Sequence, residues 1–155
     1  MKNFYNKGIT VIELLIVFAV IGILVTITLP QFSKIRENQV LKTAVNDILS
    51  SLDKARTNTL ASVNSDSYGV HFQSDQIIIF KGTSFTSGAA GNEVVNIVTP
   101  ASITNVTLGG VSGVSGDIYF NRLSGSPSTI DNNTITVSTT NYSRIITISA
   151  TGVAN

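Results

Sequence analysis

The sequence predicts an α+β fold, in which a long N-terminal α-helix, membrane-spanning in its first half, packs on a small antiparallel β-sheet domain. Three patterns indicate this fold. A strongly apolar run covers residues 9–29, apolar residues then recur at helical spacing as far as residue 63, and short alternating segments between turn residues fill residues 64–155. With 155 residues, the chain has room for the N-terminal segment and one modest domain.

Residues 9–29 are long enough to span a bilayer, because these 21 residues form a helix of roughly 30 Å. A cleaved secretory signal would have an apolar core of about 7–15 residues before a small-x-small site, and residues 28–31 contain no such site. A plain signal anchor explains the length of the run but not the charge of Glu13. Lys2 and Lys7 precede the run, which predicts a cytoplasmic N-terminus and an exported C-terminus.

Glu13 is the only charged residue in the run. A carboxylate near the bilayer centre costs roughly 2.5–3.5 kcal/mol on insertion scales, and less toward the interface. If the chain were cut after Gly8, the new amine on Ile9 would lie four residues before Glu13. The amine and the carboxylate could then compensate each other, within one helix or between neighbouring chains.

Residues 8–15 follow a short basic leader and resemble the signature of type IV prepilins and type II secretion pseudopilins. That signature is a glycine, an apolar residue and a glutamate at the fifth mature position of an apolar helix. The resemblance implies a pilin fold and a leader of residues 1–8, which prepilin peptidase removes after Gly8. It also implies N-methylation of Ile9, which stands where phenylalanine is commonest, and an assembly role for Glu13 through pairing with the amine of a neighbouring subunit.

Gly22 and Pro30 both weaken a helix. In filaments of the proteins that this chain resembles, the stretch between such a glycine and such a proline can lose its helicity. The resemblance therefore marks residues 22–30 as the helix-melting region. A simple kink at Pro30, within a continuous helix, remains the alternative for the isolated subunit.

Residues 30–63 continue the helix, because their apolar positions recur in steps of three and four. This spacing predicts an amphipathic helix that packs on the domain, and a polar turn cluster at residues 64–67 then ends it. Arg56 resembles the helix end of H-type minor pseudopilins, with a solvated or capping arginine as the alternative. The apolar positions are Leu41, Val45, Ile48, Leu52, Ala55 and Leu60.

Residues 64–155 are expected to form a globular, β-rich pilin head with two antiparallel sheets against the helix. Residues 109–116, with a repeated Gly-Val-Ser, are expected to be a flexible loop. The order of elements, with a terminal hairpin over residues 145–154, resembles the head of H-type minor pseudopilins. The expected strands are residues 68–72, 76–81, 94–98, 103–108, 117–120, 134–138 and 144–149.

The composition argues against catalysis. No cysteine is present, which excludes disulfides, a thiol nucleophile and cysteine-ligated metals. His71 is the sole histidine and is expected to be structural, while residues 131–133 are expected to form a turn rather than a calcium site. Without residues 1–8 the chain has a net charge of −1, which offers no general attraction for nucleic acid. We expect no enzyme and no cofactor.

The sequence therefore predicts a structural subunit, a minor pilin or pseudopilin, of a type IV pilus or a type II secretion pseudopilus. Its expected partners are other such subunits, prepilin peptidase, the pilus assembly platform and membrane lipid, but not nucleic acid. The expected location is the cytoplasmic membrane, crossed once with an exported head, and then a periplasmic or cell-surface filament. Two alternatives stay open: a minor pilin with an adhesive or DNA-binding role, and a membrane-anchored exported domain that never polymerises.

Overall fold

The computed structural model describes residues 8–155, and of Leu29 and Pro30 only the backbone. Most of the expected leader, including Lys2 and Lys7, lies outside the described residues. The chain divides after Arg36 into two compact units, and helix α1 (Val11–Leu60) begins in the first unit and ends in the second. The second half of the predicted helix therefore belongs to the same compact unit as the head.

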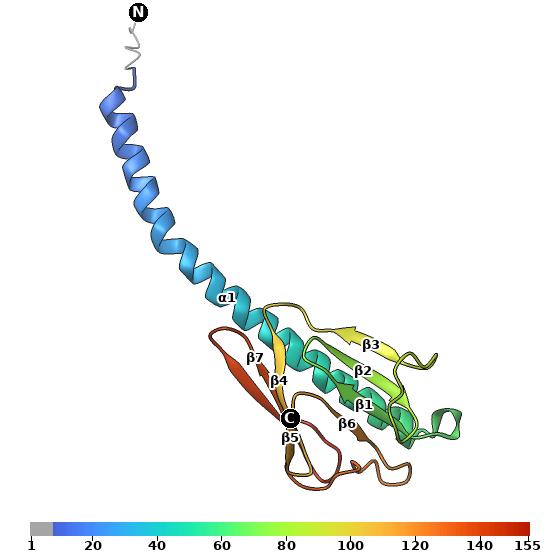
Figure 1. The fold of residues 1–155 in the computed structure, drawn as a ribbon. Helices are drawn as coiled ribbons and strands as arrows, with labels where there is room; N and C mark the ends of the chain where they lie inside the picture. The colour runs from blue at the N-terminus through green and yellow to red at the C-terminus, as the bar shows by residue number, and fades with distance from the viewer. Residues whose placement is uncertain (1–7) are drawn as a thin grey trace, which may run out of the picture. The chain divides into compact units, whose positions relative to one another are not determined.

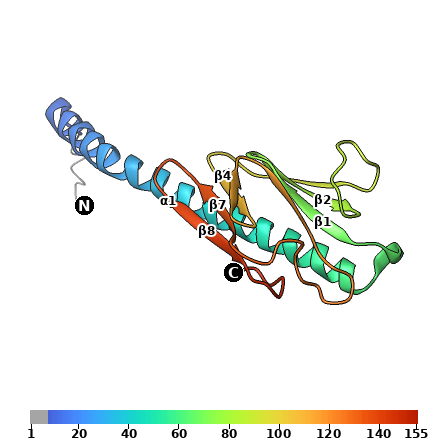
Figure 2. The same ribbon diagram turned by 60° about the horizontal axis from the view of Figure 1, so that its bottom comes forward.

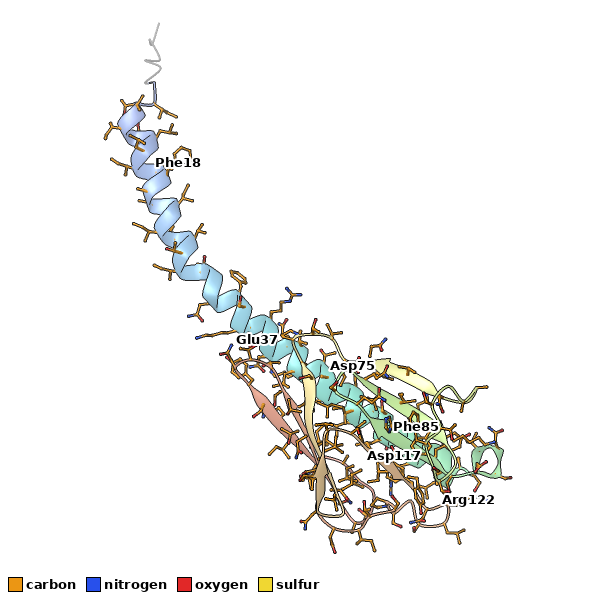
Figure 3. The ribbon with its side chains drawn as sticks, viewed as in Figure 1. Phe18, Glu37, Asp75, Phe85, Asp117 and Arg122 are labelled. Atoms are coloured by element: carbon orange, nitrogen blue, oxygen red, sulfur yellow. The ribbon has the colours of Figure 1, made fainter. Side chains whose placement is uncertain are left out.

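The first unit is dominated by the apolar part of α1. Every described side chain from Gly8 to Thr28 is exposed, and Figure 3 shows Phe18 projecting from the helix with its neighbours. A helix that is apolar on all sides is typical of a membrane span or of a helix buried among others. Within the described residues, α1 alone is long and apolar enough to cross a membrane, as judged by length and composition.

The second unit contains two four-stranded antiparallel sheets that lie on the C-terminal part of α1 (Figures 1 and 2). Sheet A has the strand order β3-β2-β1-β6, and sheet B has the order β5-β4-β7-β8. The strands of sheet A are β1 (Tyr68–Phe72), β2 (Gln76–Lys81), β3 (Glu93–Asn96) and β6 (Gly116–Tyr119). The strands of sheet B are β4 (Ser102–Leu108), β5 (Val111–Gly113), β7 (Asn133–Ser138) and β8 (Ser143–Ile148).

This arrangement confirms the predicted α+β fold, with one long apolar N-terminal helix and antiparallel sheets. All seven predicted strands are present, with ends shifted by at most two residues. The predicted flexible loop at residues 109–116 was wrong, because strand β5 lies within it. Gly109 and Gly110 have φ angles of 58° and 81°, as a tight hairpin turn requires, and this turn pairs Leu108 with Val111.

The core lies between α1 and both sheets. Leu41, Ala44, Ile48, Leu52 and Ala55 form a helix stripe whose members are at most 2% exposed. Val45, expected in this stripe, is only partly buried, because the small side chain of Ala44 takes the inward position. The stripe packs on inward-facing residues of both sheets and on Phe120, directly after β6. These residues are Val70, Phe72, Ile77, Ile79 and Ile118 from sheet A, and Ile103, Val106, Ile135, Val137, Ile146 and Ile148 from sheet B.

Helix α1 ends at Leu60, three residues before the expected boundary. Ser62 has the left-handed φ of 50°, which ends the helix before the short 3-10 turn η1 (Val63–Ser65). The completely buried Thr59 then connects the helix to the first strand, since its hydroxyl donates to the carbonyl of Ala55 at 2.8 Å and accepts from the Tyr68 N–H at 2.8 Å. The backbone conformation of the turn, rather than the polar cluster that follows, sets the helix end.

Candidate processing and assembly site

The start of α1 lies directly behind the expected cleavage point. Residues 8–10 precede the helix, and Ile9 is 79% exposed. The hydroxyl of Thr10 accepts a hydrogen bond from the Glu13 N–H at 3.2 Å, and the carbonyl of Thr10 accepts one from the Leu14 N–H at 3.2 Å. Thr10 is therefore the N-cap of the helix. The Gly8–Ile9 peptide bond consequently lies in exposed, non-helical backbone, which proteases cleave more readily than helical backbone.

Glu13 occupies the first turn of α1, three residues after the N-cap. A threonine and a glutamate at this spacing form the capping-box pattern, and a negative charge at a helix N-terminus is stabilised by about 0.3–1 kcal/mol. The structure shows the threonine half of this pattern, and the carboxylate lies where the helix N-terminus favours a negative charge, a local effect that sequence analysis missed although its signal lies in the sequence. Pairing with the amine of Ile9 would be a second and separate role that requires cleavage first, and it stays a prediction.

The expected melting region is helical from Gly22 to Pro30. The hydroxyl of Thr26 donates to the Ile23 carbonyl at 2.8 Å, and that of Thr28 donates to the Leu24 and Val25 carbonyls at 3.0 and 3.2 Å. Pro30 has no N–H to offer the carbonyl four residues before it. These hydroxyls share carbonyls within the preceding turn, a pattern that often bends helices slightly, and none of the three bonds reaches the carbonyl of Thr26, four residues before Pro30. Melting within a filament stays a prediction.

Two polar contacts tie the head end of α1 to the sheets. Glu37 accepts from the Asn141 backbone at 3.3 Å and from its side-chain amide at 3.0 Å, which holds the turn between β7 and β8 (Figure 3). On the other side, the Lys54 ammonium lies 2.6 Å from the Glu93 carboxylate on β3. Both pairs are exposed, so each contributes little stability and mainly sets position.

Arg56 fastens two loops to the helix end. Its Nε donates to the Gly125 carbonyl at 3.2 Å, and the side chain also lies against Gly152. A Cβ on Gly152, which has a φ of 82°, would overlap the Gly125 carbonyl. The arginine is therefore neither simply solvated nor a helix cap, because it bonds to a carbonyl 69 residues away.

His71 lies on the face of sheet A that points away from α1. Its ring bonds to Asp117 on β6, accepts a hydrogen bond from the side-chain amide N–H of Gln73 at 3.0 Å, and stacks on Phe85 with ring centroids 3.9 Å apart (Figure 3). Phe85 in turn meets the buried Phe80 edge-on. These contacts hold the 82–92 loop over the sheet. Within residues 8–155, no three His, Asp or Glu residues gather where they could hold a metal ion.

The described residues form a long apolar N-terminal helix and a β-rich head, which fits a protein anchored in a membrane by one helix. A family model described as the prokaryotic N-terminal methylation motif matches residues 3–29, so the N-terminal segment carries the motif of type IV prepilin-like proteins. The comparisons with curated proteins and with solved structures returned no match. Because the motif covers only the N-terminal segment, the assignment to H-type minor pseudopilins stays a prediction.

Proposed function

We propose that this protein is a structural subunit, a minor pilin or pseudopilin, of a type IV pilus or type II secretion pseudopilus, and not an enzyme. Prepilin peptidase cuts after Gly8 in the cytoplasmic membrane, and the new amine of Ile9 is methylated. The head is exported. Assembly then buries the apolar helices of many subunits against one another, while the heads cover the outside.

One observation carries this proposal: a carboxylate lies within the first turn of an exposed apolar helix, four residues after an accessible glycine–isoleucine bond. Glu13 pairs with the amine of Ile9 on a neighbouring subunit. Breaking such a pair in low-dielectric surroundings costs about 3–5 kcal/mol, because one charge is left uncompensated. The pairing also disfavours neighbours in the wrong register, since their charges would not meet.

The first test is mass spectrometry of the native full-length product. The expected mature chain begins at a methylated Ile9. A chain that begins at Met1 would refute processing and would favour the non-polymerising anchored domain.

The second test separates the two roles of Glu13. The variant Glu13→Gln keeps a capping-box residue but removes the charge, whereas Glu13→Ala removes both. Both variants should be cut and methylated like the wild type but should fail to enter filaments sedimented from sheared cells. Asp53→Asn, an exposed charge on the same helix, is the matched control and should assemble normally. Normal assembly of Glu13→Gln alone would show that capping, and not charge pairing, is what assembly needs.

The DNA-binding alternative finds little support in the head. Residues 37–155 carry six Lys or Arg and eight Asp or Glu, and one of the cations, Lys81, lies 3.3 Å from Asp66. We expect no salt-dependent binding of DNA by the full chain in detergent. Binding that weakens steeply as salt rises would revive that alternative.

A further inference from the structure

Two of the four edge strands of the head, β3 and β8, lie on opposite sides. Sheets A and B meet where β4 contacts β6, and residues of β4, β5 and β6 line one shared hollow between the sheets. The strand orders then leave β3 and β8 outermost, as Figure 1 shows for β3 and the β7 side of the head. Open edges attract other strands, because their N–H and C=O groups have no partner within the sheet.

Each edge presents two residues whose backbone groups point outward. The N–H of Ile97 bonds to Asp75 beside β2, so alternation along the strand turns Val94 and Asn96 away from β2. On β8, Thr147 exchanges both backbone bonds with Asn155 at the outer side. The same alternation turns Ser143 and Ile145 outward, beyond the part of the edge that the C-terminal residues cover.

The two edges match in apolar character. Val94 is 50% exposed and Ile145 is 66% exposed. Their neighbours Val95 and Ile146 pack toward the core, so the side chains of Val94 and Ile145 lie on the sheet faces that point away from α1. If the two edges paired, these two side chains would lie on the same face of the joined sheet and would cover each other.

The two edges differ in charge. On the side that faces α1, Arg144 of β8 and Lys42 of α1 line a hollow of about 360 Å³ at the β8 edge. At the β3 edge, Glu93 of β3 and Asp47 and Lys54 of α1 line the corresponding hollow, with a net charge of −1. A basic edge and an acidic edge on one molecule favour contact between copies, and disfavour contact between identical edges.

We propose that the β3 edge of one copy of this chain pairs with the β8 edge of a second copy. This proposal rests on the proposed function, because it assigns the lateral contact between neighbouring heads. The contact is heterologous: it uses two different surfaces, so each copy keeps one free edge and the array can continue. The contact adds to burial of the N-terminal helices and sets the register between heads.

The test is disulfide cross-linking of the full chain in its membrane, since the wild type contains no cysteine. Paired strands lie about 5 Å apart, within the range that a disulfide can bridge. The double variant Val94→Cys/Ile145→Cys should give a ladder of dimers and larger species after mild oxidation. The control Val111→Cys/Ile145→Cys, with Val111 76% exposed on β5, should give several-fold less.

Three results would overturn the proposal. The first is equal cross-linking of the control, and the second is efficient dimers from Ile145→Cys alone, which would join identical edges. The third is Ile145→Cys bonded only to a different protein, which would make an extended segment of another partner the occupant. Mass spectrometry for methylated Ile9 and sedimentation of filaments, on the same samples, separate loss of this contact from failure of the proposed function.

Charge reversal gives an independent readout that needs no cysteine. Arg144→Glu should lower the yield of filaments several-fold, and Asp47→Arg should do the same. Each contact joins the β8 edge of one copy to the β3 edge of another. In the double variant Arg144→Glu/Asp47→Arg, both edges have reversed charges that attract each other again, so much of the filament yield should return. A double variant that assembles no better than the worse single variant would contradict the charge complementarity of the two edges.

Discussion

For Gly69 on β1, strand propensity and the structure predict opposite effects of an alanine substitution on the stability of the head. By propensity alone, Gly69→Ala should stabilise a strand by roughly 0.5–1 kcal/mol. In the structure, a Cβ at this position would lie 2.7 Å from the Ile118 carbonyl oxygen on β6 and would also overlap the ring of Phe80, which is 1% exposed. Neither neighbour can move freely, because the first is backbone and the second is enclosed.

The overlap should outweigh the gain in propensity. Overpacking of a well-filled interior costs about 1–3 kcal/mol, so Gly69→Ala should destabilise the head by roughly 1–2 kcal/mol in total. At about 4 °C for each kcal/mol, the melting temperature should fall by roughly 4–8 °C. Gly91→Ala is the control, because its Cβ would meet only Lys81, at 3.9 Å.

The assay is thermal unfolding of the full chain in detergent, followed by near-ultraviolet circular dichroism. Three of the four tyrosines, at positions 68, 119 and 142, lie in the second unit, so the signal reports loss of packing in the head. Gly91→Ala should change stability by less than about 0.5 kcal/mol. If Gly69→Ala melts at or above the wild-type temperature, the close packing of β1 against β6 is wrong.

The remaining predictions concern the contacts between α1 and the rest of the head. Leu52→Ala should cost about 2–5 kcal/mol, because Leu52 is 1% exposed and its truncation leaves a cavity; Leu60→Ala, at a position 42% exposed, should cost far less in the same thermal melt. Arg56→Ala should make the 123–126 loop more sensitive to limited proteolysis, because the loop loses the hydrogen bond from Arg56 to the Gly125 carbonyl. Unchanged cleavage would contradict this role of Arg56. Glu37→Ala should speed hydrogen exchange of the Asn141 N–H, since that group donates to the carboxylate, while Glu37→Gln should keep part of the protection.

The processing motif was predictable because its parts lie next to one another in the sequence. Gly8, Ile9 and Glu13 have fixed positions relative to the apolar run, and no tertiary contact is needed to recognise them. Most strands were also predictable, since each alternating segment buries one face whatever its partners are. The Gly109–Gly110 turn also had a local signal, because paired glycines between Leu108 and Val111 are typical of a tight hairpin.

The polar contacts of the head were not predictable, because they join distant parts of the chain. Asp117 meets His71 from 46 residues away, and Asn141 reaches Glu37 from 104 residues away. Before the sheets form, nothing distinguishes these side chains from other exposed polar residues. The choice of Ala44 over Val45 has a similar cause, since only the crossing of α1 over two sheets decides which of two adjacent small residues points inward.

The pairing of Asn155 with Thr147 affects how the protein can be labelled. A fluorescent fusion or affinity tag after Asn155 would leave the head beside β8 and would crowd the adjacent stretch of that strand. Gly88 is a better insertion point, because it lies in an exposed turn with no atom within 4 Å of a Cβ built there. A short epitope placed there would leave both the strand and the apolar helix untouched, so that antibodies could follow the protein in intact cells.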